Sequence, residues 1–449
     1  MNQLIDFPYQ HVLVLGLAKS GTAATKVLVK SGKRVRVNDL KTELNDPIVE
    51  ELQQLGVEVI TGGHPLHVLD GIDVLVKNPG IPYSNIIVQE AERRKIPILT
   101  EVELAGQLAS NSLVGITGSN GKTTTTTLIY EMLNHSKQQV KIAGNIGTVA
   151  IEVAEQLQQN ETMVIELSSF QLLGVQKFKP TTAVVLNLFE AHLDYHETFD
   201  NYKNAKANIF MNQTSEDFLV YNLDDKKVVD MCQPAKATKV PFSTKEKVGN
   251  GAWCDQTHLY FRDEQIILLE EIALVGQHNL ENILAAVSAA MLNGATKEAI
   301  HQVLTTFTGV RHRLQFVENI KGRLFYNDSK ATNVLATSKA LSSFDQPTIL
   351  LAGGLDRGND FDDLIPYLKQ VKAMVVFGET AEKLMELAEQ IGIEKAELVD
   401  NVKHAVQRAY QLSNENDVIL LSPACASWDQ YRTFEERGDM FIEAVHTLK

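Results

Sequence analysis

The chain has 449 residues, of which 44% are hydrophobic and 22% charged, and its 42 basic and 56 acidic side chains give a formal net charge of −14. A chain of this length is too long for a single hydrophobic core and predicts two to four domains. The excess of acidic side chains argues against a general nucleic-acid binder. The three cysteines lie far apart without a CxxC pair, which argues against a disulfide framework or structural zinc. The first residues lack the features of a signal peptide, and no apolar run is long enough for a membrane span. We therefore expect a cytoplasmic protein without membrane or nucleic-acid partners.

Apolar runs alternate with helical patterns over the first hundred residues. The predicted strands are residues 11–15, 34–37, 57–60, 74–76 and 97–99, with a helix from about Thr22 to Lys30. This alternation predicts a parallel, doubly wound sheet. The turn Gly16-Leu-Ala-Lys-Ser-Gly21 follows the first strand, and Asp39 ends the second. Ala18 replaces the second glycine of GxGxxG, which disfavours an NAD site but leaves the uracil, ribose or diphosphate of a nucleotide as candidate ligands. The loop 78–82 is either a plain turn or a further ligand contact.

The stretch Gly115-Ile-Thr-Gly118-Ser-Asn-Gly-Lys122-Thr123-Thr124 is the strongest chemical signal. It follows the apolar Leu113-Val114 and precedes a predicted helix, as a phosphate-binding loop does. Lys122 is then expected to reach the terminal phosphates of ATP or GTP, and Thr123 to offer its hydroxyl to Mg²⁺. Ile116 stands where a full Walker A pattern has its first glycine. The alternative is an ordinary polar turn with a solvated lysine.

Polar groups also follow the other strands predicted in this second unit. Glu166 ends the strand 162–166, where a nucleotide-bound Mg²⁺ is usually held. His192 and Asp194 follow the strand 183–186, and are either solvated loop groups or ligands for a second metal or the substrate. Residues 217–271 suggest a small subsidiary sheet, and residues 279–292 a helix. Lys203 and Lys206 lie on a predicted helix whose pattern alone indicates a solvated face.

A third α/β unit begins near residue 310, with predicted strands 323–326, 348–352, 373–377 and 418–421. Three of these strands are followed by polar loops: residues 327–333, 353–357 and 422–430. Such loops meet at the carboxyl edge of a parallel sheet, where ligands bind. Their cations and short polar groups would suit an anionic amino acid. Cys425 has no partner histidine in the sequence pattern, so we expect a packed thiol rather than a nucleophile.

Seven ordered motifs together resemble the Mur ligases of peptidoglycan synthesis, over nearly the whole chain. They are Gly118-Ser-Asn-Gly-Lys-Thr123, Glu166-Leu-Ser-Ser-Phe-Gln171, His192-Leu-Asp194, Gly276-Gln-His-Asn279, His312-Arg313, Asn327-Asp-Ser-Lys-Ala-Thr-Asn333 and Ser422-Pro-Ala-Cys-Ala-Ser427. The resemblance implies an α/β fold of three domains. These are a UDP-substrate-binding Rossmann-like domain (1–102), a central P-loop ATPase domain with a parallel sheet (103–309), and a C-terminal Rossmann-like domain for the incoming amino acid (310–449).

The resemblance also implies a reaction. ATP would phosphorylate the terminal carboxylate of UDP-N-acetylmuramoyl-L-alanine, and the amine of D-glutamate would attack the resulting acyl phosphate. Two Mg²⁺ ions and a carbamylated Lys206 are expected, because the family carries this modification at the matching lysine. A monomer is expected.

Site residues follow from the motif matches. Catalytic roles are implied for Lys122, Glu166, His192 and Lys206, and metal contacts for Thr123, Glu166, His192 and carbamylated Lys206. Nucleotide contacts are implied for Gly118, Ser119, Asn120, Gly121, Lys122, Thr123, Thr124, Asn279, Arg313 and Asp328. Substrate contacts are implied for Ser20, Asp39, Gly80, Asn145, His192, Lys330, Arg357, Ser427 and Phe434. Lys19-Ser20, Leu40-Lys41 and Arg357 depart from the family's familiar residues, which bears on uracil recognition and on the D-glutamate contact.

Other functions stay open at this point. A sister amide ligase, such as the L-alanine-adding enzyme or a folylpolyglutamate synthetase, would share the central domain. The dibasic-adding ligase carries a DNPR-type motif that this chain lacks, which favours D-glutamate. A nucleotide switch or transport ATPase would leave the polar loops of the third unit without a role.

Overall fold

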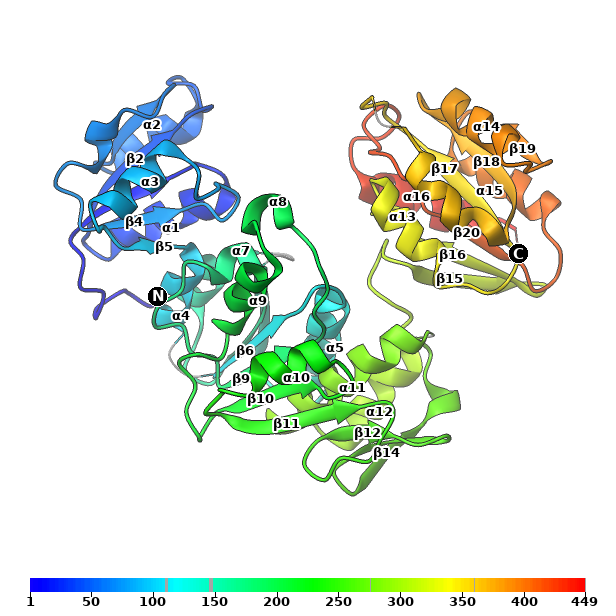
Figure 1. Ribbon diagram of the computed structural model, residues 1–449, viewed down its shortest axis with the longest axis horizontal. Helices are drawn as coiled ribbons and strands as arrows, with labels where there is room; N and C mark the ends of the chain where they lie inside the picture. Colours follow the sequence, from blue (N-terminus) through cyan, green and yellow to red (C-terminus); the bar gives the residue numbers. More distant parts are fainter. Residues whose placement is uncertain (110–111, 145–147, 275, 359, 449) are drawn as a thin grey trace. The chain divides into compact units, whose positions relative to one another are not determined.

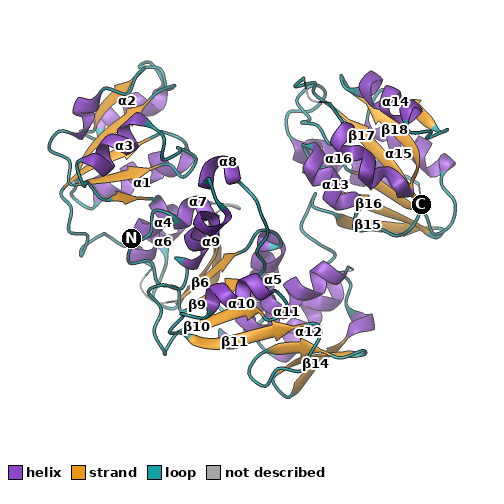
Figure 2. Cartoon of the chain, in the orientation of Figure 1, coloured by secondary structure: helices purple, strands orange, loops and turns teal. Residues whose placement is uncertain are grey.

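The computed structural model describes residues 1–109, 112–144, 148–274, 276–358 and 360–448. It contains three sheets, each accompanied by helices (Figures 1 and 2). Residues 1–272 and 277–306 form one compact unit, which contains the first two sheets. Residues 273–276 and 307–449 form a second unit around the third sheet. The predicted α/β class is confirmed.

The first sheet has five parallel strands in the order β3-β2-β1-β4-β5. Its elements are β1 (His11–Leu15), α1 (Lys19–Lys30), β2 (Arg34–Asp39), α2 (Pro47–Gln54), β3 (Glu58–Thr61), η1 (Leu66–Leu69), β4 (Val74–Lys77), α3 (Ile86–Arg93) and β5 (Ile98–Leu99). All five predicted strands are present, and α1 starts one turn earlier than predicted. Because β1 and β4 are neighbours, the loops that follow them share the carboxyl edge at the point where the strand order reverses.

The second sheet has nine strands in the order β14-β13-β12-β11-β10-β9-β6-β8-β7. They are β6 (Ser112–Thr117), β7 (Val140–Gly144), β8 (Thr162–Glu166), β9 (Thr182–Val185), β10 (Phe218–Asn222), β11 (Thr238–Ser243), β12 (Ala252–Cys254), β13 (His258–Phe261) and β14 (Glu264–Leu268). The expected separate sheet within residues 217–271 was wrong. Strand β12 pairs in parallel with β11, through Phe242–Ala252 and Ser243–Trp253, so β12 to β14 extend the main sheet. The free N–H and C=O groups at the edge of β11 are satisfied in this way.

Helices cover the nine-stranded sheet. They are α4 (Glu101–Leu108), α5 (Lys122–His135), α6 (Ala150–Gln156), α7 (Ser169–Leu172), α8 (Leu193–His196), α9 (Phe199–Ala207), α10 (Lys226–Cys232), η2 (Leu269–Glu271), α11 (Gln277–Leu292) and α12 (Lys297–Thr306). Helix α5, which follows the phosphate loop, packs against α11 and α12. The apolar face predicted for α11 is fully buried, since Ile283, Ala286, Val287 and Ala290 have no exposed surface. The helix that follows the phosphate loop is therefore anchored by buried apolar packing.

The third sheet has six strands in the order β15-β16-β20-β17-β18-β19, all parallel except β15. Its elements are β15 (Gln315–Ile320), β16 (Arg323–Asn327), α13 (Val334–Leu341), β17 (Thr348–Gly353), η3 (Asp362–Gln370), β18 (Val371–Phe377), α14 (Ala381–Gln390), β19 (Ala396–Leu398), α15 (Val402–Leu412), β20 (Val418–Leu421) and α16 (Phe434–His446). Because β16, β20 and β17 are adjacent, the three polar loops predicted to share a sheet edge do so.

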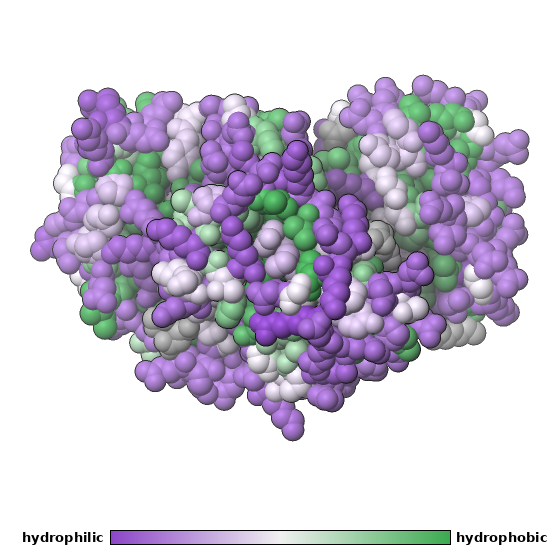
Figure 3. Space-filling view, turned by 60° about the horizontal axis from the view of Figure 1, so that its bottom comes forward, coloured by the Kyte–Doolittle hydropathy of each residue, from purple (hydrophilic) through white to green (hydrophobic). Residues whose placement is uncertain are grey.

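Hydrophilic side chains dominate the face of the molecule in Figure 3, with hydrophobic ones in small areas between them. Within the described ranges, no helix is both long and apolar enough to cross a membrane.

Candidate active site

The phosphate loop joins β6 to α5, and two glycines shape it. Gly121 caps α5 with a φ of 81°, and a Cβ there would lie 2.1 Å from Oδ1 of Asn282. Gly118 has a φ of 154°, and its Cβ would lie 2.9 Å from that of Leu186. Side chains are thus excluded from both positions, which keeps the loop's backbone close to its neighbours. The Lys122 amine donates to the carbonyls of Gly118 (2.9 Å) and Ser119 (3.0 Å), so it folds back over the loop.

Thr123 and Glu166 form a buried pair beside this loop. The Thr123 hydroxyl donates to Oε2 of Glu166 at 2.7 Å, and Glu166 ends β8, the neighbour of β6. A hydroxyl and a carboxylate so placed offer oxygen ligands to a cation that bridges to phosphate. Within the described ranges, no three His, Cys, Asp or Glu side chains come together as a metal site.

Lys206 is buried under the same loop. Only 2% of its surface is exposed, its amine donates to the Gly118 carbonyl at 2.9 Å, and it lies 4.6 Å from the ring centre of Tyr202. Burial, reinforced by the charge of Lys122, lowers the pKa of the Lys206 amine well below its ordinary value. The sequence pattern suggested a solvated lysine, but its amine is held in a site that favours the neutral form.

His192 precedes α8 in the left-handed region, with a φ of 56°. Its ring packs edge-on against Phe170, with 4.9 Å between ring centres. The backbone conformation is uncommon for a side chain of this size and marks a constrained position.

The Ser119 hydroxyl, next to the phosphate loop glycine, lies 2.9 Å from the Tyr202 hydroxyl, which ties α9 to the loop.

A cavity of about 540 Å³ brings several predicted residues together in the first unit. Ser20, Gly80, Lys122 and His192 all line it, although they come from both sheets. The structure also places unpredicted side chains there: Glu101, Ser168, Phe170 and Gln171. Ser168, Phe170 and Gln171 belong to the motif Glu166-Leu-Ser-Ser-Phe-Gln171, which contributes to the family resemblance without an implied role for these three residues, whereas Glu101 had no signal in the sequence. A cavity between two carboxyl edges, with a phosphate loop on one side, suits an extended anionic substrate.

Glu101, at the start of α4, is the least expected group in the cavity. It is 3% exposed, and its Oε2 accepts the N–H of Ile151 at 3.2 Å. Burial raises its pKa to about 7, although hydrogen bonds from Ile151 and Gln171 work in the opposite direction. A charged residue inside the sequence Leu99-Thr-Glu-Val102 indicates a helix start, and nothing in that pattern marks it as buried.

Asp39 acts within its own domain. Its carboxylate accepts the backbone N–H groups of Leu17 (2.7 Å), Lys41 (2.8 Å) and Thr42 (2.8 Å), which binds the loop after β1 to the loop after β2. Burial works to raise the pKa of this carboxyl, but the backbone donors outweigh it and the net shift is downward. Asp39 does not line the cavity, so its place near a substrate remains a prediction.

The remaining predicted nucleotide contacts lie in two places. Asn120 exchanges hydrogen bonds with Asn187, its N–H donating to Oδ1 at 2.8 Å. Asn279 accepts from Asn282 at 3.3 Å, next to Gly121, and Thr124 lies in the first turn of α5. Arg313 is exposed in the second unit. Asn145 lies outside the described residues.

The carboxyl edge of the third sheet gathers the other predicted contacts. The Asp328 carboxylate accepts from the Ser422 hydroxyl (2.9 Å) and the Leu314 N–H (3.0 Å), and burial raises its pKa to about 7 despite these bonds. The Lys330 amine lies 5.2 Å from the ring centre of Phe434. Ser427 is 2% exposed, and within the described residues its hydroxyl has no hydrogen-bond partner. Arg357, which is exposed, stacks on Trp428 at 4.8 Å.

Arg437 organises this edge and was not predicted. The side chain is fully buried and donates to the Ser329 carbonyl (2.9 Å) and the Cys425 carbonyl (3.1 Å), so it links two of the polar loops. Burial lowers its pKa to about 10. The guanidinium binds no carboxylate in these contacts, and its charge lies directly behind the loops.

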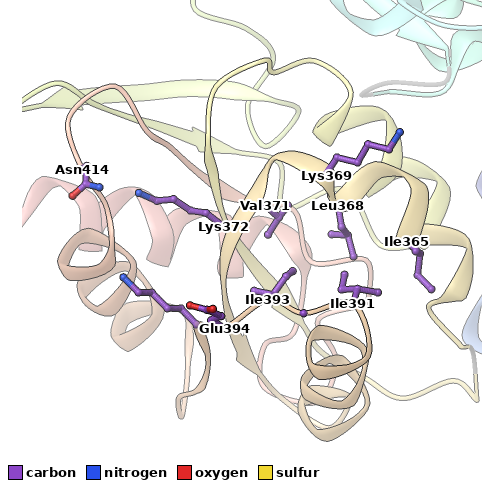
Figure 4. A pocket seen from close by; sticks show the side chains of 11 residues that line it. Ile365, Leu368, Lys369, Val371, Lys372, Ile391, Ile393, Glu394 and Asn414 are labelled. Carbon is purple, nitrogen blue, oxygen red and sulfur yellow. The ribbon is translucent and has the colours of Figure 1, made fainter.

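A second cavity, of about 660 Å³, lies elsewhere in the second unit (Figure 4). Leu368, Val371 and Ile393 line it together with Lys372, whose amine is paired with Asp417. None of the predicted site residues lines this cavity.

Comparison with protein families matches three consecutive models. Residues 10–100 match the Mur ligase MurD-like N-terminal domain, residues 116–290 the Mur ligase middle domain, and residues 312–425 the Mur ligase glutamate ligase domain.

Curated relatives align with the chain from end to end. The UDP-N-acetylmuramoylalanine–D-glutamate ligase of Oceanobacillus iheyensis is 60% identical over 449 residues, which is all of both chains. The protein of the same name from Bacillus subtilis is 58% identical over 443 residues, or 98% of each chain.

Solved structures share the fold at low sequence identity. The UDP-N-acetylmuramate–alanine ligase MurC of Thermotoga maritima aligns with 98% of this chain and 100% of its own, at a TM-score of 0.56 and 17% identity. The MurF ligase of Thermotoga maritima, solved in complex with ADP, also gives a TM-score of 0.56 and 17% identity, and aligns with 100% of this chain and 98% of its own.

Proposed function

The chain belongs to the Mur ligase family, and we propose that it joins D-glutamate to UDP-N-acetylmuramoyl-L-alanine at the expense of ATP, in peptidoglycan precursor synthesis. Relatives of that name, 58% and 60% identical over essentially the whole chain, support the choice of substrates. In the structure, the observation that carries the proposal is the buried Lys206 amine bonded to the phosphate loop. A simple nucleotide hydrolase would not need a second, buried lysine amine beside the phosphate loop.

The buried amine of Lys206 supports its proposed carbamylation. A neutral lysine amine adds to CO₂, forming an N–C bond and releasing one proton, and the product carries a carboxylate-like negative charge. The lowered pKa of Lys206 supplies the neutral amine this step requires. The carbamate would place a negative charge near Lys122, so the two side chains would attract each other, whereas a protonated Lys206 would be repelled by Lys122.

The Thr123–Glu166 pair fits Mg²⁺. This ion prefers six oxygen ligands, keeps several waters, and is usually held by one or two carboxylates together with substrate phosphates. One hydroxyl and one buried carboxylate beside a phosphate loop meet that need without a larger cluster. Bound there, Mg²⁺ would neutralise charge on the transferred phosphoryl group. His192 and carbamylated Lys206 are the proposed holders of a second ion.

In the proposed reaction, each unit would supply one of the reactants. The first unit would hold the substrate carboxylate near Lys122, so that its oxygen attacks the γ-phosphorus and ADP leaves. The second unit would present D-glutamate, whose amine forms the new C–N bond as phosphate departs. Lys330 and Arg357 are suitable cations for its carboxylates, and the unpaired Ser427 hydroxyl is a suitable donor. The proposed domains are residues 1–102, 103–309 and 310–449. A monomer in the cytoplasm remains a prediction.

One assay tests the proposal. Purified protein with ATP, Mg²⁺ and UDP-N-acetylmuramoyl-L-alanine should release phosphate only when D-glutamate is added, and the product should gain one glutamyl residue by mass spectrometry. Equal phosphate release without an amine would indicate a hydrolase. Turnover of UDP-N-acetylmuramate with L-alanine would instead indicate the sister ligase.

A further inference from the structure

Lys77 is a buried lysine that the proposed chemistry does not use. It ends β4, is 1% exposed, and lies among the rings of Tyr83 and Tyr195, with its amine 5.0 and 5.8 Å from their centres. No carboxylate forms a salt bridge with it among the residues that the structure describes, and burial lowers its pKa to about 8. Burying a charged amine costs free energy unless hydrogen bonds offset the loss of water, so the partners of this amine indicate its role.

Those hydrogen bonds converge on one loop. The amine donates to the Ile81 carbonyl at 2.8 Å and, at 3.4 Å each, to the carbonyls of Asn78 and Pro79. Its donor capacity is thus directed at the turn that follows β4. On the cavity side, Asn78 donates to the Ser20 hydroxyl at 3.2 Å and accepts the Gly80 N–H at 3.1 Å. Lys77 therefore binds the backbone of loop 78–81, and residues of this loop line the cavity.

The fourth hydrogen-bond partner of Lys77 is Tyr195, which lies among the helices of the nine-stranded sheet. The Lys77 amine donates to the Tyr195 hydroxyl at 3.1 Å, and the single hydrogen of that hydroxyl has two carbonyl acceptors within reach, those of Pro79 (3.1 Å) and Ile81 (3.0 Å). Tyr195 lies on α8, the single-turn helix that His192 precedes. Its ring also packs against Phe170, another residue of the cavity wall.

We propose that Lys77 is a positioning residue for the UDP-linked substrate. By binding loop 78–81 and the Tyr195 hydroxyl together, it sets the distance between Ser20 and Gly80 on one wall of the cavity and His192 on the other. The inference rests on the proposed function only in that the cavity holds this substrate. It does not depend on which amino acid is added. Such a role predicts a larger effect on the UDP-linked substrate than on ATP, because none of the proposed nucleotide contacts lies in loop 78–81 or on α8.

The test compares steady-state constants of three variants. Lys77→Met keeps the apolar stem and removes the donors, and Tyr195→Phe removes only the bridging hydroxyl. Lys33→Met is the matched control, because the Lys33 amine also donates to a backbone carbonyl, that of Phe7, at 2.8 Å, and lies 5.7 Å from the Phe7 ring centre, away from the cavity. Lys77→Met should raise the KM for UDP-N-acetylmuramoyl-L-alanine about ten- to a hundredfold, with the KM for ATP changed less than about twofold.

In the double variant Lys77→Met with Tyr195→Phe, the rise in the KM for UDP-N-acetylmuramoyl-L-alanine should be smaller than the product of the two single rises, since both changes break the same link. Tyr195→Phe decides the matter if Lys77→Met does not fold. The inference is overturned if both KM values rise equally, if only kcat falls, or if Lys33→Met gives the same selective loss. Direct binding of UDP-N-acetylmuramoyl-L-alanine by calorimetry gives the ratio between wild type and variant even if D-glutamate proves not to be the amine. Failure of the proposed function is therefore distinguishable from failure of this inference.

Discussion

Lys77 and Lys206 are both buried, yet their surroundings differ in kind. The Lys77 amine has four hydrogen-bond acceptors within reach, and burial lowers its pKa only to about 8, so it can keep its proton near neutral pH. Among the described residues, the Lys206 amine has one hydrogen-bond acceptor, the Gly118 carbonyl, and the charge of Lys122 lies close by, so the loss of its proton is favoured more strongly. The first arrangement suits a permanent structural donor, and the second suits an amine that reacts.

Lys206 can be tested against a neighbour on the same helix. Lys206→Ala should lose most activity, because the buried negative group proposed to hold a metal is absent, and short carboxylates such as formate should restore part of it. Lys203→Ala is the control, since Lys203 is on the surface and pairs with Asp200 at 2.7 Å. NMR of protein in ¹³C-bicarbonate should show a carbamate signal in wild type and in Lys203→Ala only. Full activity of Lys206→Ala would end the carbamate proposal.

Glu101 gives the clearest dependence of stability on pH. Its carboxyl has a folded-state pKa of about 7 against an ordinary 4.5, so the folded chain binds more protons than the unfolded chain between these values. Wild type should therefore lose about 3 kcal/mol relative to Glu101→Gln as the pH rises through this range, and the loss should be complete only about one unit above the folded-state pKa, near pH 8. Urea unfolding across pH 4.5 to 8 measures this, with the exposed Glu50→Gln as the control for adding one amide. A difference that stays constant with pH would refute it.

At the scale of elements, many strands could be predicted because they are apolar or alternating runs bounded by polar turns, whereas β7, β15 and β19 were not predicted. The predicted strands 11–15, 162–166 and 418–421 have the observed bounds. The pairing of β12 with β11 could not be predicted, since it depends on an open sheet edge and not on a local pattern. The phosphate loop was recognisable from residue types alone. Lys77, Glu101 and Arg437 were missed because a charged residue in a sequence is ordinarily expected at the surface, and their burial arises from contacts made by distant segments.

The start of α5 shows why the phosphate loop needs its glycine at 121. Gly121→Ala would place a side chain in the left-handed region and bring its Cβ to 2.1 Å from Oδ1 of Asn282. Gly32→Ala is the matched control, with a φ of 75° and no atom within 4 Å of its Cβ, so it isolates the backbone cost of about 1 kcal/mol. We expect Gly121→Ala to lower the free energy of unfolding by more than Gly32→Ala and to weaken ADP binding, which Gly32→Ala should leave intact. Equal losses in urea unfolding would show that Asn282 gives way freely.

At the scale of the whole chain, the two compact units have separate hydrophobic cores. The apolar residues of β16 to β20 pack with their own helices, as those of the first two sheets do with theirs. The chain passes between the units three times, near residues 272, 276 and 306. A ligand that binds one unit alone should therefore stabilise that unit alone, by mass action.

UDP provides that test, because the cavity proposed for the UDP-linked substrate is lined only by residues of the first unit. The chain's two tryptophans divide between the units, Trp253 in the first and Trp428 in the second, so the variants Trp428→Phe and Trp253→Phe each leave one reporter. UDP at a hundred times its Kd should stabilise the Trp253 transition by about 2.7 kcal/mol and leave the Trp428 transition in place. Inorganic pyrophosphate at the same concentration is the control for a general anion effect. If UDP moved both transitions together, the units would unfold as one, and the assignment of UDP to the first unit alone would have no support from stability.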